Sequence, residues 1–266
     1  NCRPIRYRNY AMSDKDLLRN RFAANLHSYN SLAIVQQQIC DELANMLSAH
    51  IKPKHIARGL EIGTGTGFLT RRILEFCPHA TWTLNDLVEG SANFLEAYTR
   101  NHAIRFQWGD AEDLAQFSDR PYDLIATAST VQWFDHLPIF IKSLPELLSE
   151  TGVIALSTFG PDNFIEIRTT TGDGLDYYTA DELSKLFQQA GLTILECKEY
   201  TRQLNFDSPT AVLRHIKATG VNAIHKSRWT PRRLTQFETD YRTQYSTSTG
   251  EVTITYHPIL IVAQKS

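Results

Sequence analysis

The sequence contains little cysteine, no metal-ligand spacing and no long apolar run. Its four cysteines form no Cys-x-x-Cys pair, and its nine histidines show no His-x-His or His-x-x-x-His spacing. These absences exclude a metal site or a disulfide framework and are typical of reduced thiols in a cytoplasmic protein. No stretch of about 18 apolar residues is present, so the sequence predicts no membrane-spanning helix.

The chain also lacks an excess of charge of either sign. Its 27 Lys and Arg residues nearly balance its 29 Asp and Glu residues, which gives a formal net charge of −2. This balance excludes a globally basic nucleic-acid binder, although it is compatible with a local basic patch. The length of 266 residues and the hydrophobic content of 42% are typical of one large globular domain, with or without an insertion.

The first residues carry positive charge without the apolar core of a secretion signal. Three arginines lie within residues 1–10, and no apolar stretch follows them. We expect residues 1–12 to be a disordered leader of a single domain that spans residues 1–266. Over residues 13–49, apolar side chains recur at spacings of three and four, which predicts one continuous helical segment that Pro53 ends.

Strands and helices alternate in the middle of the chain, which predicts parallel strands joined by right-handed helical crossovers. We predict strands at 56–62, 80–85, 104–109, 122–128, 152–159 and 192–200, with helices at 68–76, 89–99, 137–148 and 180–190.

The alternation changes after residue 204. Two helical patterns, at 208–219 and 230–245, follow one another without a strand between them. A final strand is predicted at 252–263, although Pro258 interrupts it. We therefore expect residues 205–248 to be a helical insertion before the last strand of an α/β sheet.

The strongest local signal is the segment Leu-Glu-Ile-Gly-Thr-Gly-Thr-Gly at residues 60–67, where a strand ends and a helix begins. Glycines at such a turn let the backbone approach a ligand closely. The spacing differs from the Gly-x-Gly-x-x-Gly of dinucleotide sites, and the Lys of a phosphate-binding loop is absent. Glu61 disfavours a phosphate and suits a positively charged ligand.

Two further acidic residues follow the next two predicted strands. Asp86 lies about 20 residues beyond the glycines, where a carboxylate can accept hydrogen bonds from ribose hydroxyls. Asp110 follows the third strand, where it can accept from an adenine amino group. Either residue alone would be read as a surface acid or a helix cap. Together with the glycine loop, at successive strand ends, they favour a nucleoside site.

These segments resemble class I S-adenosylmethionine-dependent methyltransferases. Residues 60–67 resemble their motif I, Leu-Asn-Asp at 84–86 their acidic motif II, and Trp-Gly-Asp-Ala-Glu-Asp-Leu at 108–114 their adenine-binding motif. The resemblance implies a Rossmann-like, seven-stranded, mostly parallel sheet whose last strand is antiparallel. It implies S-adenosylmethionine as cofactor, S-adenosylhomocysteine as product and no metal. The implied cofactor-binding residues are Glu61, Gly63, Thr64, Gly65, Gly67, Asp86, Leu87, Asp110, Ala111, Glu112, Gln132 and Gln36.

Four segments outside this core resemble the malonyl-acyl carrier protein O-methyltransferases of biotin synthesis. They are the Phe22, Tyr29 and Gln36 series, residues 129–134, residues 158–168 with the pattern Thr-Phe-Gly-x2-Asn-x2-Glu-x-Arg, and Ile-Lys-Ala-Thr-Gly-Val-Asn at 216–222. Thr64 departs from the family, in which many members have Cys. The resemblance implies methyl transfer to the free carboxylate of a malonyl thioester on acyl carrier protein, giving the methyl ester that primes pimeloyl synthesis.

A malonyl carboxylate is already ionised at pH 7, so this transfer requires no general base. It does require groups that hold the carboxylate in line with the breaking bond. We expect Arg168 to hold it with a bidentate fork, although Arg168 can equally pair with Glu166 on the surface. We expect Tyr29 to belong to a helical lid at residues 13–52 that covers the reacting methyl group, and core packing is its alternative role.

The predicted insertion is locally basic. Residues 202–242 contain eight Lys and Arg residues against three acids, an excess of five positive charges in a chain whose net charge is −2. Because the family resemblance implies an acidic carrier protein as partner, we expect this surface to dock it, whereas an ordinary solvated helix face is the alternative. The candidate docking residues are Arg214, Lys217, Arg228, Arg232 and Arg233.

Three other functions fit parts of the sequence. A different small-molecule methyltransferase, such as a C-methylating enzyme of quinone synthesis, would share the core motifs. An RNA methyltransferase would use the basic insertion, but the dense aromatic and basic pattern of an RNA platform is absent. An inactive cofactor-binding scaffold is disfavoured by the intact glycine loop. We expect a monomer without a nucleic-acid partner.

Overall fold

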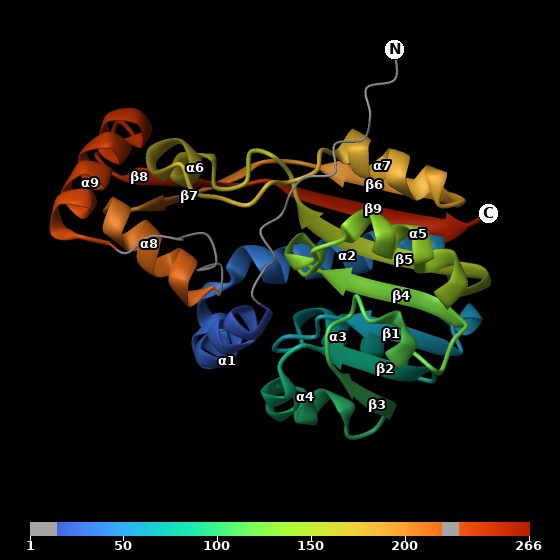
Figure 1. Ribbon diagram of the computed structural model, residues 1–266. Helices are drawn as coiled ribbons and strands as arrows, with labels where there is room; N and C mark the ends of the chain where they lie inside the picture. Colours follow the sequence, from blue (N-terminus) through green and yellow to red (C-terminus); the bar gives the residue numbers. More distant parts are fainter. Residues whose placement is uncertain (1–14, 220–228) are drawn as a thin grey trace, which may run out of the picture.

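The computed structural model describes residues 15–219 and 229–266, so the expected leader at 1–12 lies outside the described residues. The described chain forms a seven-stranded sheet in the order β3-β2-β1-β4-β5-β9-β6 (Figure 1). The strands of this sheet are β1 (Arg58–Ile62), β2 (Thr81–Asp86), β3 (Ala103–Trp108), β4 (Tyr122–Ala128), β5 (Leu148–Phe159), β6 (Leu192–Glu199) and β9 (Pro258–Lys265).

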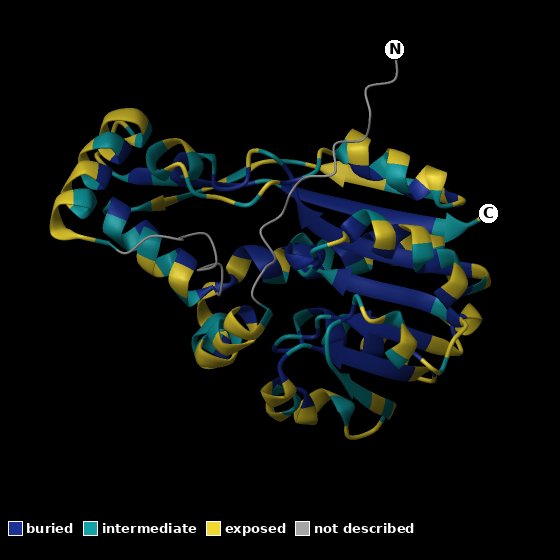
Figure 2. Ribbon diagram, in the orientation of Figure 1, coloured by how far each residue is buried: buried dark blue, intermediate teal, exposed yellow. Residues whose placement is uncertain are grey.

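The strand directions confirm the predicted Rossmann-like sheet. The first five strands pair in parallel, whereas β9 runs antiparallel to both β5 and β6. Helices cover both faces, so the central strands are buried over most of their length and read as nearly continuous apolar segments (Figure 2). One face packs against α2, α3 and α4, and the other against α5 and α7. The helices of these layers are α2 (Ile34–His50), α3 (Phe68–Phe76), α4 (Ala92–Thr99), α5 (Leu137–Leu147) and α7 (Ala180–Gln189).

The predicted continuous helix at 13–49 is wrong, because the chain breaks at Ala33 into α1 (Lys15–Leu32) and α2. Ala33 has φ −86° and ψ 48°, which is not helical, and its side chain is fully buried. The break lets α2 pack on the sheet while α1 turns away toward the strand ends (Figure 1). The apolar periodicity continues through the break, so the sequence pattern does not reveal it.

The region after β6 is a small α/β layer rather than two helices alone. β7 (Arg202–Phe206) pairs antiparallel with β8 (Val252–Tyr256), and α8 (Pro209–Ala218) and α9 (Pro231–Tyr245) lie between them in the chain. The single final strand that we predicted is divided, since Pro258 begins β9. A short helix, α6 (Ile165–Thr171), packs beside α9 and β8, and the sequence analysis missed it.

Buried hydrogen bonds fasten this layer to the end of the main sheet. The Glu166 carboxylate accepts from the Thr255 backbone N–H at 3.0 Å and from the Thr255 hydroxyl at 2.6 Å. The Asn163 side chain accepts from the His257 N–H at 3.2 Å and donates to the Tyr177 hydroxyl at 3.0 Å. Leu183 and Phe187 of α7, which begins with a capping box formed by Thr179 and Glu182, are buried against the main sheet.

Candidate active site

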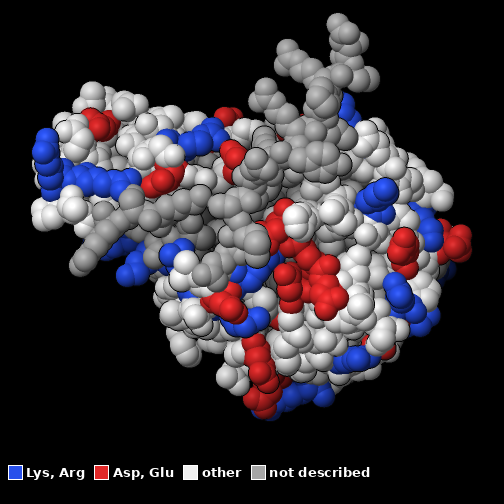
Figure 3. Space-filling view, in the orientation of Figure 1, with Lys and Arg blue, Asp and Glu red and all other residues white. Residues whose placement is uncertain are grey.

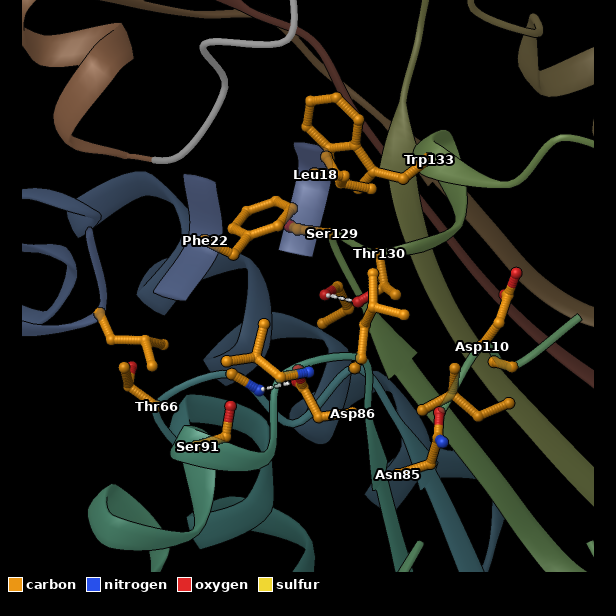
Figure 4. A pocket seen from close by; sticks show the side chains of 18 of the residues that line it. Leu18, Phe22, Thr66, Asn85, Asp86, Ser91, Asp110, Ser129, Thr130 and Trp133 are labelled. Atoms are coloured by element: carbon orange, nitrogen blue, oxygen red, sulfur yellow. Dashed lines mark hydrogen bonds between the residues drawn. The ribbon is translucent and has the colours of Figure 1, made fainter. Parts of the chain in front are cut away.

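A cleft of roughly 890 Å³, its open mouth included, lies at the carboxyl ends of β1, β2, β3 and β4 (Figure 4). The glycine loop and the end of β2 form its floor, whereas α1 and the turn η4 (Val131–Trp133) form its walls. In an open parallel α/β sheet, ligands bind at this edge, where the strand order reverses between β1 and β4. The cleft is therefore the candidate active site.

The glycine loop adopts the backbone that its sequence predicts. Gly63, Gly65 and Gly67 all have positive φ, at 75°, 52° and 93°. A Cβ on Gly63 would lie 2.1 Å from the Thr130 hydroxyl, whereas a Cβ on Gly65 would project into open space with nothing within 4 Å. Gly63 is thus required by packing, and Gly65 leaves the cleft floor open for a ligand.

Asp86 lies at the centre of the cleft floor and is buried (Figure 4). One carboxylate oxygen accepts from the Gly65 N–H at 2.7 Å and from the Thr64 hydroxyl at 3.4 Å, and the other accepts from the Val88 N–H at 2.8 Å. Burial raises the pKa of Asp86, and these donors counteract the shift in part. Leu87, the next residue, also lines the cleft. Asp86 therefore ties the glycine loop to the end of β2 while it faces the space where a ribose would bind.

Glu61 lies behind the glycine loop and does not line the cleft itself. Burial, together with the nearby charge of Asp86, raises the pKa of the Glu61 carboxyl to about 8, and Thr70 offsets this only in part. Among the described residues, no donor is placed to make a well-formed hydrogen bond with either carboxyl oxygen. Because an unpartnered buried carboxyl is costly, the site is suited to a ligand that brings a positive charge close to the loop.

The cleft end below β3 is formed by Asp110 and Ala111. One Asp110 oxygen accepts from the Glu112 N–H at 3.1 Å, and Lys15 of α1 approaches the carboxylate at 3.3 Å. Glu112 does not line the cleft, because its carboxylate is engaged by Lys15 and by two backbone amides of the chain after η4. Its expected contact with the cofactor therefore stays a prediction that the lining of the cleft does not support.

Helix α1 covers the open side of the cleft, as expected for a lid. Phe22 packs edge-on against Trp133 of η4, with ring centroids 5.6 Å apart, and the two rings close the upper part of the cleft (Figure 4). Tyr29, deeper in the cleft, stacks on Phe68 at 5.8 Å, and burial raises its pKa. The α1 residues that line the cleft are Lys15, Leu18, Phe22, Asn25, Leu26 and Tyr29.

The predicted site residues Gln132, Gln36 and Arg168 also lie outside the lining of this cleft. Gln132 donates to the Ser129 carbonyl at 2.7 Å and lines a smaller depression behind η4. Gln36 is buried in α2, near Tyr256. Arg168 lies on α6 in a third depression beside Gly174, so the expectation that it borders the cofactor cleft is not met. The physical reason is that the chain after β5 leads away from the cleft to the α8–α9 layer.

The predicted docking cations have different environments. Arg214 and Lys217 are exposed on α8, opposite its buried face, and Arg232 is exposed at the start of α9. Arg233 is half-buried, pairs with Asp173 at 3.3 Å and lies over the Trp229 ring. Arg228 lies outside the described residues.

Sequence reasoning missed several cleft residues. Ser129 has a positive φ of 52°, which is unusual for a non-glycine residue, and its buried hydroxyl has no hydrogen-bond partner in the described chain. The Thr66 hydroxyl in the glycine loop is also buried and unpartnered. Backbone strain and unpartnered buried groups are typical of binding sites, but no local sequence pattern reports either. Lys15 gave no signal because its partners are distant in the sequence.

The residues of the cleft fit a nucleoside ligand that carries a positive charge. The open glycine loop admits close backbone contact, Asp86 and Asp110 supply acceptors at two strand ends, and Glu61 supplies a buried carboxyl that a nearby positive charge would ionise. Within the part of the chain that the structure describes, no group of acidic, Cys or His side chains is arranged to hold a metal ion. Among residues 15–219 and 229–266, no helix has the length and apolar character needed to cross a membrane.

Residues 31–197 match the model of a family described as a methyltransferase domain. The chain also resembles the solved structure of the N-methyltransferase NodS from Bradyrhizobium japonicum, in complex with S-adenosyl-L-homocysteine. The TM-score is 0.59 at 12% identity, and the alignment covers 93% of this chain and 98% of NodS, which shows a shared fold. Together with the sheet order, these matches define the class: the protein is a methyltransferase with a Rossmann-like fold.

Two curated relatives are similar over nearly their whole length. The malonyl-[acyl-carrier protein] O-methyltransferase of Porphyromonas gingivalis is 38% identical over 94% of this chain and 96% of its own. The protein of the same name from Chlorobium luteolum is 35% identical over 96% and 97% of the two chains. The chain belongs to the family of malonyl-[acyl-carrier protein] O-methyltransferases.

Proposed function

We propose that the protein transfers a methyl group from S-adenosylmethionine to the free carboxylate of a malonyl thioester on acyl carrier protein. The product is the malonyl methyl ester that primes synthesis of the pimeloyl precursor of biotin. The observation that carries the proposal is the extent of the similarity, which includes about 95% of the chain and therefore the α8–α9 layer outside the methyltransferase core.

We propose that the cofactor lies across the cleft floor. Its ribose would lie against Asp86 and Leu87 and its adenine against Asp110 and Ala111, while its amino acid end would lie near the glycine loop, above Glu61. When bound, S-adenosylmethionine supplies an electrophilic methyl group on a sulfonium. The chain's own task is to orient the acceptor oxygen and to exclude water, because opposite charges on the two reactants are neutralised during transfer.

The acceptor carboxylate needs no base, because it is already ionised at pH 7. Among the cleft residues that the structure describes, Lys15 is the single cation, and it is engaged by acidic side chains. We propose that the Tyr29 hydroxyl orients the carboxylate from the lid, since its raised pKa keeps it a hydrogen-bond donor. Such a neutral donor suits an acceptor whose negative charge falls in the transition state, because a fixed cation would favour the ground state.

Arg168 lies in a depression separate from the cofactor cleft, and we therefore propose Tyr29 rather than Arg168 for the substrate carboxylate. For carrier-protein docking we retain Arg214, Lys217 and Arg232, which are exposed. The Ser28 hydroxyl of α1 donates to the Ala218 carbonyl at 3.5 Å, so the end of α8 that carries Lys217 adjoins the lid. Figure 3 shows Lys and Arg side chains over α9 and near α8, on the same face of the molecule. Arg233 contributes less, since Asp173 neutralises it.

A methyl-transfer assay with a labelled cofactor tests the substrate. Malonyl-carrier protein should accept the label, whereas acetyl-carrier protein, which has no free carboxylate, should not. Malonyl-coenzyme A and RNA complete the panel, because labelled RNA would favour the rival function. We further propose that the protein acts in the cytoplasm as a monomer, which sedimentation at working concentrations would test.

A further inference from the structure

The Glu112 carboxylate joins three segments that fold separately around the cleft. One oxygen accepts from the Asp135 N–H at 2.8 Å and from the Lys15 ammonium at 2.7 Å, and the other accepts from the His136 N–H at 2.6 Å. Asp135 and His136 directly follow Trp133 and Phe134, which line the cleft. Glu112 itself lies on the chain after β3, two residues beyond Asp110. Its position thus fixes the wall formed by η4 relative to the floor.

Lys15 connects the same carboxylate to the lid. Besides Glu112, its ammonium lies 3.3 Å from Asp110 and 3.8 Å from Asp135, and it also lies over the Phe134 ring. Figure 3 shows acidic side chains gathered on the face of the molecule that it displays, near its middle. One turn further along α1, Arg19 donates to the Leu87 carbonyl at 3.2 Å. Two cations of α1 therefore fasten the lid across the cleft.

This contact differs from an ordinary surface ion pair. The side chains of Lys15 and Glu112 are only 21% and 14% exposed, and each makes more than one polar contact. Burial alone would lower the pKa of Lys15, but the hydrogen bond to Glu112 and the charges of the three acids outweigh burial and raise it. The lysine therefore remains charged at neutral pH. Partly buried pairs of this kind are worth more than exposed ones.

We propose that Glu112 is a positioning residue and that Lys15 is its latch, which holds α1 closed over the bound cofactor and sets how long the cofactor stays. The inference rests on the proposed cofactor site but not on the identity of the methyl acceptor. Six residues of α1 line the cleft, so a cofactor that occupies it would contact α1 and would leave more readily when α1 moves away. Opening α1 separates Lys15 from its three acids, and the strength of this contact therefore limits dissociation.

The test is the dissociation rate of S-adenosylhomocysteine, measured by stopped-flow displacement on the full chain. This ligand lacks the sulfonium charge, so its rate reports lid opening rather than attraction to the acids. Lys15→Met should raise the dissociation rate by about ten- to a hundredfold, because hydrogen bonds to charged groups are worth roughly 1.5–3 kcal/mol and about 1.4 kcal/mol is a factor of ten. Lys15→Arg should restore most of the parental rate. Lys54→Met, an exposed lysine outside the cleft, is the matched control and should change nothing.

The salt dependence of the dissociation rate distinguishes a latch from a contact that only stabilises the fold. Between about 0.05 M and about 0.5 M salt, the parental dissociation rate should rise, because screening weakens the ion pairs. Lys15→Met should lose this dependence, and Lys15→Met should raise the dissociation rate by a smaller factor in the Glu112→Gln background than in the parent, because the two side chains contact one another. A parental rate in Lys15→Met, or an unchanged salt dependence, would overturn the latch. Neither result would affect the malonyl assay, and a failed malonyl assay would not affect these rates.

Discussion

Glu61 should couple cofactor binding to the release of a proton, and this release can be measured. Burial holds the pKa of this carboxyl at about 8 in the unliganded protein, so at pH 7 it is about nine-tenths protonated. A ligand that places its ammonium or sulfonium near the glycine loop favours the ionised form and lowers that pKa. If the pKa returns close to its ordinary value, binding at pH 7 releases about 0.9 proton.

Isothermal titration with S-adenosylmethionine, in buffers with different enthalpies of ionisation, measures the number of protons released. The apparent association constant should rise about tenfold per pH unit below pH 8 and level off above it, because the ionised carboxyl binds the cation. Glu61→Gln should release no proton from this site and should remove the pH dependence, whereas the exposed Glu75→Gln serves as control. Equal proton release in Glu61→Gln and in the parent would refute the reasoning.

The same shift affects the stability of the unliganded protein. Because the folded pKa of about 8 exceeds the unfolded value near 4.5, the unfolded state loses this proton first as the pH rises. The unfolding free energy should therefore decrease between about pH 4.5 and about pH 8 and not outside that range, relative to Glu61→Gln. Denaturant titrations of the two proteins at several pH values would measure the difference.

Four substitutions test the remaining assignments. Gly65→Val should abolish cofactor binding in calorimetry while the protein remains folded by circular dichroism, because a branched residue resists a φ of 52° and would fill the open floor. Asp86→Ala should weaken cofactor binding by about 1.5–3 kcal/mol, the worth of hydrogen bonds to a charged acceptor, and equal affinity would place the ribose elsewhere. Arg168→Ala should leave turnover near the parental value, and a large loss would return Arg168 to the substrate site. Reversing both Arg214 and Lys217 to Glu should raise the KM for malonyl-carrier protein several-fold at low salt but not S-adenosylhomocysteine affinity, since steering charges are screened by salt.

Local sequence signals were sufficient for the sheet and the cleft floor. Three segments, the glycine loop, residues 84–86 and residues 108–112, lie at the ends of successive strands. Because parallel strands end at the same edge of a sheet, their positions in the sequence are enough to predict that they lie together. Helix caps also depend on residues close together in the sequence, as the capping box of Thr179 and Glu182 at the start of α7 shows.

The remaining features depend on contacts between distant residues, which periodicity does not encode. Lys15 and Glu112 are 97 residues apart, and β7 pairs with β8 across the whole α8–α9 segment. The break at Ala33 is set by two packing partners, the sheet and the strand ends, rather than by a helix-breaking residue. The position of Arg168 away from the cofactor cleft could not be predicted, because α6 redirects the chain after β5, and seven residues without an apolar period give no sign of a helix.

The most direct test of the proposed function is the mass of the carrier protein after one turnover. Malonyl-carrier protein incubated with the enzyme and S-adenosylmethionine should gain one methyl group in place of a proton, and mild base should remove it as expected for an ester. The added mass should lie on the malonyl group after the prosthetic arm is released from the carrier. An unmodified malonyl group, or a methyl group on the carrier polypeptide instead, would contradict the proposal.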